Sequence, residues 1–135
     1  VLNREELRDF ILETYCAKHD FPWIQHPEHE VFRHPNNRKW FAVIMDVPKN
    51  KLGLQGTDKM DVVNFKSDAD LIWALKGEAG FFPAYHMSKT NWITVALDGT
   101  VPAERIKKLL AMSYEATAVQ KSKFIKTAGE RDFRF

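Results

Sequence analysis

Five polar residues within one short segment could bind a phosphate or another anion. Arg33, His34, Asn37, Arg38 and Lys39 surround a predicted turn between two apolar runs. Arginine can donate two parallel hydrogen bonds to a phosphate, while lysine acts beside it as a point charge. Such a hairpin could lie as a wing against a nucleic-acid backbone, with Arg33, Arg38 and Lys39 as its contacts.

A structural role accounts for the same segment equally well. In that interpretation Asn36 and Asn37 build the turn, because asparagine side chains hydrogen-bond their own backbone. Arg38 would then form an ion pair with Glu28 or Glu30. The sequence leaves both interpretations open.

A second group of polar residues lies in the irregular segment 84–90, directly before a strongly apolar run. Irregular polar segments often carry binding residues; here Lys89 could bind an anion and Tyr85 could stack on a base. Together with His86, and with His34 from the first segment, they define a second hypothesis: a pocket for a protein group or a small anion, without catalysis. The structural alternative is that Tyr85 and His86 hydrogen-bond the backbone and hold the segment.

Positive charge is concentrated in the second half of the chain. The whole chain has 20 Lys and Arg against 18 Asp and Glu, a net charge of +2. Between Arg105 and Lys126 six bases stand against one acid, Glu115. Lys107 and Lys108 could extend a phosphate-binding surface, or they could form the solvated face of a helix. The pI of 8.7 predicts weak, salt-sensitive binding to nucleic acid.

The residue pattern offers no catalytic constellation. The chain has five histidines, but only His26 and His29 are close in sequence, and their spacing matches no zinc motif. A Gly-rich phosphate loop and a nucleophile elbow are both absent. Cys16 is expected to be a packed thiol on the first helix. We therefore expect no catalytic residue, no metal and no other cofactor.

Length and composition indicate one domain in a reducing compartment. A chain of 135 residues fits a single core, and a lone cysteine cannot form a disulfide within the chain. No run of about 18 apolar residues exists, so no membrane-spanning helix is expected. The resulting expectation is a cytoplasmic protein, a monomer, without membrane association.

Helices are predicted at both ends of the chain and strands between them. Asn3 and Glu6 form a capping box for the first helix, and Ser67 is expected to cap a short helix that ends at Gly77. Two further helices are expected, one opening at Pro102 and one over 116–127. The expected strands are 30–33, 39–45, 51–54, 60–66 and 91–97.

This order favours an α+β fold. A parallel sheet would need a helix after each strand, and the chain has too few. We expect a single antiparallel sheet of about five strands, with the N- and C-terminal helices packed on one face as a two-layer sandwich. Trp40, Trp73 and Trp92 are expected in the core.

Several motifs resemble those of the MmcQ/YjbR family. They stand in the family order over most of residues 4–115, and the segment after Ala116 resembles the family least. The chain departs from the family pattern at Ser88 and Asn91, where the family usually has Asn and His. The motifs are Val31-Phe32-Arg33-His34, Asn37-Arg38-Lys39-Trp40-Phe41-Ala42, Leu52-Gly53-Leu54, Val62-Val63-Asn64-Phe65-Lys66, Pro83-Ala84-Tyr85-His86-Met87-Ser88-Lys89, Trp92-Ile93-Thr94-Val95 and Ser113-Tyr114.

The resemblance implies one domain over residues 1–135 with the fold of the bacterial frataxin CyaY, sometimes called a double-wing fold. Members of the family are often labelled DNA-binding, largely because of that architecture. Applied to this chain, the resemblance implies weak binding of DNA phosphates by Arg33, Arg38, Lys39, Lys89, Lys107 and Lys108. A protein or a small anionic ligand remains the alternative partner.

Overall fold

The computed structural model describes residues 2–118. Within them the elements are α1 Arg4–Tyr15, β1 Lys18–Asp20, β2 Glu30–Arg33, β3 Trp40–Pro48, the 3₁₀-helix η1 Lys49–Leu52, β4 Lys59–Lys66, α2 Ala69–Leu75, β5 Phe81–Pro83, β6 Trp92–Ala96 and α3 Ala103–Thr117. The strands form one antiparallel six-stranded sheet in the order β1-β2-β3-β4-β6-β5. No helix among these residues is long and apolar enough to cross a membrane.

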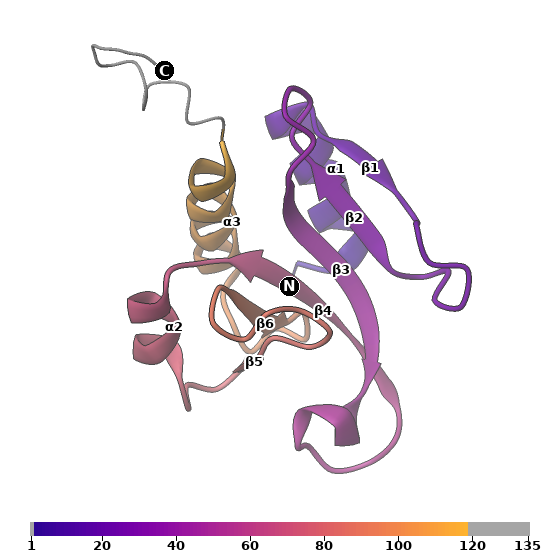
Figure 1. The fold of residues 1–135 in the computed structure, drawn as a ribbon. Helices are drawn as coiled ribbons and strands as arrows, with labels where there is room; N and C mark the ends of the chain where they lie inside the picture. The colour runs from indigo at the N-terminus through magenta and orange to yellow at the C-terminus, as the bar shows by residue number, and fades with distance from the viewer. Residues whose placement is uncertain (1, 119–135) are drawn as a thin grey trace.

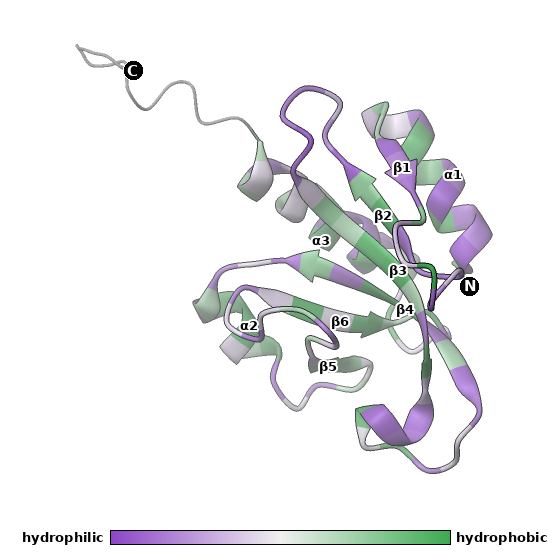
Figure 2. Cartoon of the chain, turned by 45° about the vertical axis from the view of Figure 1, so that its right-hand side comes forward, coloured by the Kyte–Doolittle hydropathy of each residue, from purple (hydrophilic) through white to green (hydrophobic). Residues whose placement is uncertain are grey.

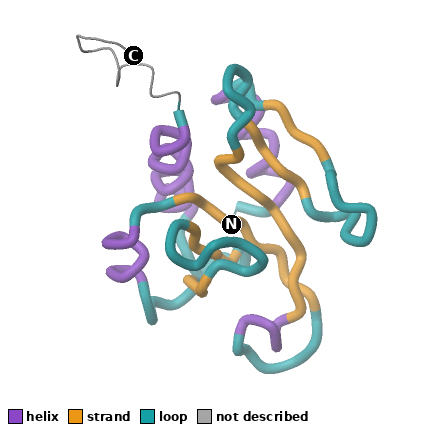
Figure 3. Tube along the Cα trace, viewed as in Figure 1, coloured by secondary structure: helices purple, strands orange, loops and turns teal. Residues whose placement is uncertain are grey.

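Helices α1 and α3 cover the same face of the sheet, and α2 lies toward the β6–β5 edge (Figure 1; Figure 3). This arrangement confirms the expected α+β fold with terminal helices on one face of an antiparallel sheet. The sheet has one strand more than the approximate number expected, because the expected strand at 51–54 does not form and β1 and β5 were not predicted. Both are three residues long and lie at the two edges, where so short a run carries little pattern in the sequence.

The sheet buries apolar side chains on both faces. Successive strand residues point to opposite faces, so Phe32 and Ile44 join the core under the helices, whereas Val31 and Val43 face the other way. That second face is covered by partly buried side chains of the loops, among them Trp23. Figure 2 shows β3 largely in green, as a strand buried on both faces requires, whereas β4 carries both green and purple segments.

Three local predictions were wrong: a strand at 51–54, the residue that caps α2, and the burial of Cys16. Segment 51–54 is not a strand, because the chain forms η1 and then turns at Gly53, which has φ of +80°. Helix α2 is capped by Asp68 rather than Ser67, since the Asp68 carboxylate accepts a hydrogen bond from the Leu71 N–H at 2.8 Å. The predicted last helix lies mostly outside the described residues. Cys16 is exposed as the left-handed cap of α1, with φ of 52°, so the expected packed thiol is wrong.

Ser113 of α3 joins the two central strands where their ladder ends. Pairing of β3 with β4 stops at Ala42 and Phe65. At the next position the buried Ser113 hydroxyl accepts from the Lys66 N–H at 2.9 Å and donates to the Phe41 carbonyl at 2.6 Å. A helix side chain thus completes the sheet and fixes α3 against it.

Replacing Ser113 by Ala should destabilise the protein by about 1–3 kcal/mol, because it leaves a buried N–H and a buried carbonyl without a partner. Urea denaturation monitored by circular dichroism measures the change. The matched control is Ala111→Ser, which changes an exposed position of the same helix and should stay within about 0.5 kcal/mol of the natural chain. Equal effects of the two changes would show that the Ser113 bridge contributes nothing to stability.

Candidate functional site

The turn between β2 and β3 is joined by hydrogen bonds to the end of α3. The Asn37 side chain accepts from the Lys39 N–H at 2.8 Å and donates to the Thr117 carbonyl at 3.0 Å. Arg38 has φ of 63°, one of three non-glycine residues with positive φ among those described. Since the left-handed region costs an ordinary L-residue about 1–2 kcal/mol, this turn would be more stable with glycine at that position. The two hydrogen bonds of the Asn37 side chain hold this turn, as the structural interpretation expected for Asn37.

His34 contributes to the contact between this turn and α3, and it does not lie in a pocket with Tyr85, His86 and Lys89. Its Nε2 lies 2.8 Å from the Thr117 hydroxyl, which itself donates to the Ser113 carbonyl, so Nε2 carries the proton. The ring stacks on Tyr114 with centroids 4.1 Å apart and is 4% exposed. Burial lowers the pKa of His34 below its ordinary value, so the neutral imidazole is favoured. Strand alternation explains the error, because His34 follows Phe32 on the helix-covered face.

Arg38 and Lys39 are exposed, and neither side chain has an ion-pair or hydrogen-bond partner in the part of the chain that the structure describes. The expected alternative, a pair between Arg38 and Glu28 or Glu30, is not formed. Glu30 is fully buried and is instead bound by two other side chains, Arg8 at 2.8 Å and His19 at 2.6 Å.

The Arg33 side chain already has binding partners within the protein. Its guanidinium donates to both carboxylate oxygens of Asp20, at 3.1 and 3.3 Å, and lies 5.4 Å from the Trp40 ring centroid. Asp20 offsets its charge, so Arg33 contributes less to a phosphate surface than the sequence suggested.

The lysines of α3 are not part of the same surface. Lys107 places its ammonium 4.6 Å from the Phe10 ring centroid and 4.0 Å from Glu104. Lys108 is exposed, but it precedes Thr117 by nine residues, which is about 14 Å and two and a half turns of helix. It therefore faces away from the side of α3 that holds the β2–β3 turn. The six predicted phosphate contacts are consequently dispersed, and only Arg38 and Lys39 remain as an adjacent, unpaired cluster.

A buried polar pair that sequence reasoning missed holds the segment after β5. Asn64 of β4 and Thr94 of β6 face each other in register, and the Thr94 hydroxyl donates to the Asn64 side chain at 2.5 Å. Asn64 donates to the Tyr85 carbonyl at 3.0 Å, and Thr94 accepts from the Tyr85 N–H at 2.9 Å. The available signal was an Asn inside an otherwise apolar strand, where a buried amide needs partners.

The same segment divides the predicted pocket residues between two hollows. His86 lines a small hollow of about 120 Å³ with His26, His29 and Trp23, and the His26 and His29 rings stack with centroids 4.7 Å apart. Burial lowers the pKa of His29, whose Nε2 lies 3.5 Å from the Asp46 carboxylate. No group of three or more His, Cys, Asp or Glu among residues 2–118 is placed to hold a metal ion.

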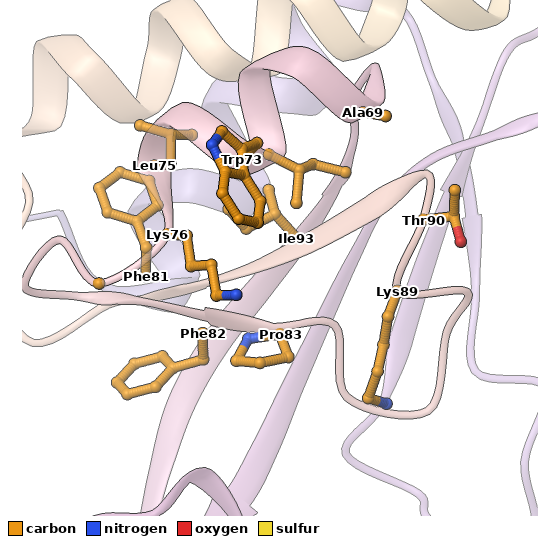
Figure 4. A pocket seen from close by; sticks show the side chains of 12 residues that line it. Ala69, Trp73, Leu75, Lys76, Phe81, Phe82, Pro83, Lys89, Thr90 and Ile93 are labelled. Atoms are coloured by element: carbon orange, nitrogen blue, oxygen red, sulfur yellow. The ribbon is translucent and has the colours of Figure 1, made fainter.

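Lys89 lines a different and larger hollow, which we call the α2 pocket. Its volume is about 330 Å³, and its walls come from α2, β5 and the start of β6 (Figure 4). Trp73 of α2, expected in the core, is instead 72% exposed at this pocket. Helix α2 has only seven residues; Leu75 is buried and Leu71 and Ile72 pack partly against the core, so Trp73 lies on the side of the helix that is left at the surface. The sequence alone could not show which face of so short a helix would be covered.

Comparisons with known proteins identify a family and no activity. The sequence matches the YjbR family model over residues 12–116. Uncharacterized protein YyaQ of Bacillus subtilis (strain 168) is 34% identical over 117 residues, which is 87% of this chain and 99% of that protein. A Pseudomonas syringae crystal structure has a TM-score of 0.83 at 40% identity, covering 86% of this chain and 99% of the other. Deinococcus radiodurans protein DR2400 has a TM-score of 0.65 at 27% identity, covering 96% and 89%.

Acid should destabilise the protein through His34. Because burial places its folded-state pKa below the ordinary 6.5, the unfolded chain binds more protons between the two values. The stabilisation is complete above about pH 6.5 and is lost as pH falls through the lowered pKa. Urea denaturation at about pH 7.5 and about pH 5 should therefore show a smaller loss of stability in His34→Gln, which keeps an N–H donor and does not titrate.

His29 also titrates with a lowered pKa, so some loss of stability should persist in His34→Gln. His29→Gln is the comparison that separates the two contributions. If His34→Gln and the natural chain lose stability in parallel, folding does not lower the pKa of His34.

Proposed function

This chain belongs to the YjbR family, and we propose that it is a non-catalytic protein that binds nucleic-acid phosphates with little sequence specificity. The observation that supports this function is the Arg38–Lys39 cluster on the hydrogen-bonded β2–β3 turn, whose side chains have no ion-pair partner among residues 2–118. Phosphate contacts position a protein on nucleic acid without reading its sequence, and two adjacent cations at the tip of a hairpin suit that task. Neither side chain forms an ion pair or hydrogen bond within residues 2–118; the backbones of both residues bond within the turn, where the Arg38 N–H donates to the His34 carbonyl at 3.1 Å. The positive φ of Arg38 costs energy, and backbone strain of this kind is often found at functional positions.

The size of the cationic surface predicts weak binding. Residues 1–118 contain 15 Lys and Arg against 16 Asp and Glu, a net charge of −1. Residues 119–135 contain five against two, a net charge of +3. We propose that these charges add to the attraction of phosphates, with affinity that falls steeply as salt is added.

Reversal of charge at Arg38→Glu and Lys39→Glu should weaken binding at least about tenfold and reduce the salt slope by about 2, one for each lost phosphate contact. Fluorescence anisotropy of labelled double- and single-stranded DNA, at about 50 and about 200 mM salt, measures both quantities. Arg38→Gly tests the same contact without added repulsion, since glycine suits the backbone conformation and should keep the fold intact.

The matched control reverses two lysines of η1, Lys49→Glu and Lys51→Glu, which changes the net charge equally. They lie at the far end of the nine-residue strand β3, about 30 Å from the turn (Figure 1). Equal loss of binding in both double variants would mean that only net charge matters. Unchanged binding in the Arg38 and Lys39 variant would refute the role of the turn.

A second candidate function is the binding of a small anionic ligand without catalysis. The observation that favours it is the position of Lys89, which is one of the residues that line the apolar α2 pocket. Tyr85 and His86, originally grouped with Lys89, would serve this function indirectly, because their segment carries Lys89. The two candidate functions use different surfaces and can be tested separately.

A further inference from the structure

The α2 pocket leaves an unusual amount of aromatic surface open to solvent. Trp73 is 72% exposed, although most large apolar side chains of the described residues are buried. Figure 4 shows Trp73 on one side of the opening and Phe82 and Pro83 on the other, with Ile93 between them. The volume of about 330 Å³ lies at the lower end of the range of small-molecule sites, which is about 300–1,000 Å³. A planar ring system of one or two rings fits a slot of this size and lining.

The charges at the pocket are all of one sign. Its lining residues include two lysines, Lys76 and Lys89, and no acid. The Lys76 ammonium lies 4.6 Å from the Trp73 ring centroid, and no carboxylate pairs with it in the described part of the chain. The Lys89 ammonium donates to the Ala84 carbonyl at 2.9 Å, which leaves two of its three N–H groups free. Two cations beside an apolar floor favour a ligand that is both apolar and negatively charged.

We propose that the α2 pocket binds a small aromatic carboxylate. The ring lies in the slot against Trp73, and the carboxylate accepts hydrogen bonds from Lys89 and from Lys76, which turns from the indole toward it. An aromatic ring gains from stacking on the indole beyond the burial of its area. Charge-assisted hydrogen bonds from two ammonium groups then orient the acid group at the rim. This proposal specifies the ligand of the second candidate function and does not depend on nucleic-acid binding.

Isothermal titration of the full chain with 2-naphthoate tests the proposal, with 2-naphthalenemethanol as the neutral probe of the same ring. We expect one saturable site for naphthoate with a Kd below about 1 mM, at least about tenfold tighter than for the alcohol. Chemical shift changes in a nitrogen–proton correlation spectrum should centre on α2, β5 and residues 84–93. The absence of saturable naphthoate binding, or equal binding of acid and alcohol, would overturn the proposal.

Variants of the pocket assign the two parts of the ligand. Lys89→Gln should weaken naphthoate binding about three- to tenfold and leave the alcohol unchanged, whereas Trp73→Ala should weaken both. The matched control is Lys108→Gln, which removes the same charge from an exposed site on α3 and should change neither. Shift changes that grow with protein concentration and not with naphthoate would identify a second copy of the chain as the occupant instead.

The variant Lys76→Gln distinguishes a failure of the naphthoate proposal from a failure of the nucleic-acid proposal. Lys76→Gln should weaken naphthoate binding and leave the DNA anisotropy titration unchanged. Loss of DNA binding in that variant would show that both ligands share one surface and would overturn the separation of the sites.

Discussion

The burial of the sheet on both faces is the constraint on which the rest of the structure depends. Helices cover one face and loop side chains cover much of the other, so most residues of β3, β4 and β6 are buried on whichever face they lie. A polar side chain on these strands must therefore find a partner inside the protein, because an unpaired buried polar group costs about 1–3 kcal/mol. A few buried polar residues therefore hydrogen-bond to neighbouring loops, and these hydrogen bonds position the segments that carry both candidate sites.

The buried polar groups near the candidate sites join segments that are far apart in the sequence. Ser113 bridges the ends of β3 and β4, and Thr117, one turn further along α3, receives His34. Asn64 and Thr94 similarly hold the backbone of Tyr85. The pairing is nearly complete, since Arg4 Nε is the one buried side-chain nitrogen or oxygen without a hydrogen bond among residues 2–118. Both anion-binding candidates are thus presented by loops whose bases are fixed in the core.

The same constraint explains how much the sequence could predict. The fold followed from apolar spacing and turn residues, because those patterns are local and the central strands are long. His34 and Trp73 were misplaced for a different reason: a histidine beside a turn and a tryptophan on a seven-residue helix carry no local mark of the face they occupy. Asn64 was not predicted to be a structural residue, although an amide within an apolar strand requires hydrogen-bond partners when it is buried. Contacts between residues far apart in the chain, such as that of His34 with Thr117, could not be read from either segment alone.

The number of cations in this chain says less about function than their internal partners do. Arg33 and Lys107 each meet a carboxylate and an aromatic ring, and Lys89 is held by a carbonyl, so much of their binding capacity is used within the fold. Two pairs of cations lie at the candidate sites, and their surroundings differ. Arg38 and Lys39 project into water from a polar turn, where long-range attraction to many phosphates is the available interaction. Lys76 and Lys89 border an apolar slot, where a single charged group on a ring is favoured. The difference lies in the surface beside each pair of charges, and it argues for two ligands rather than one.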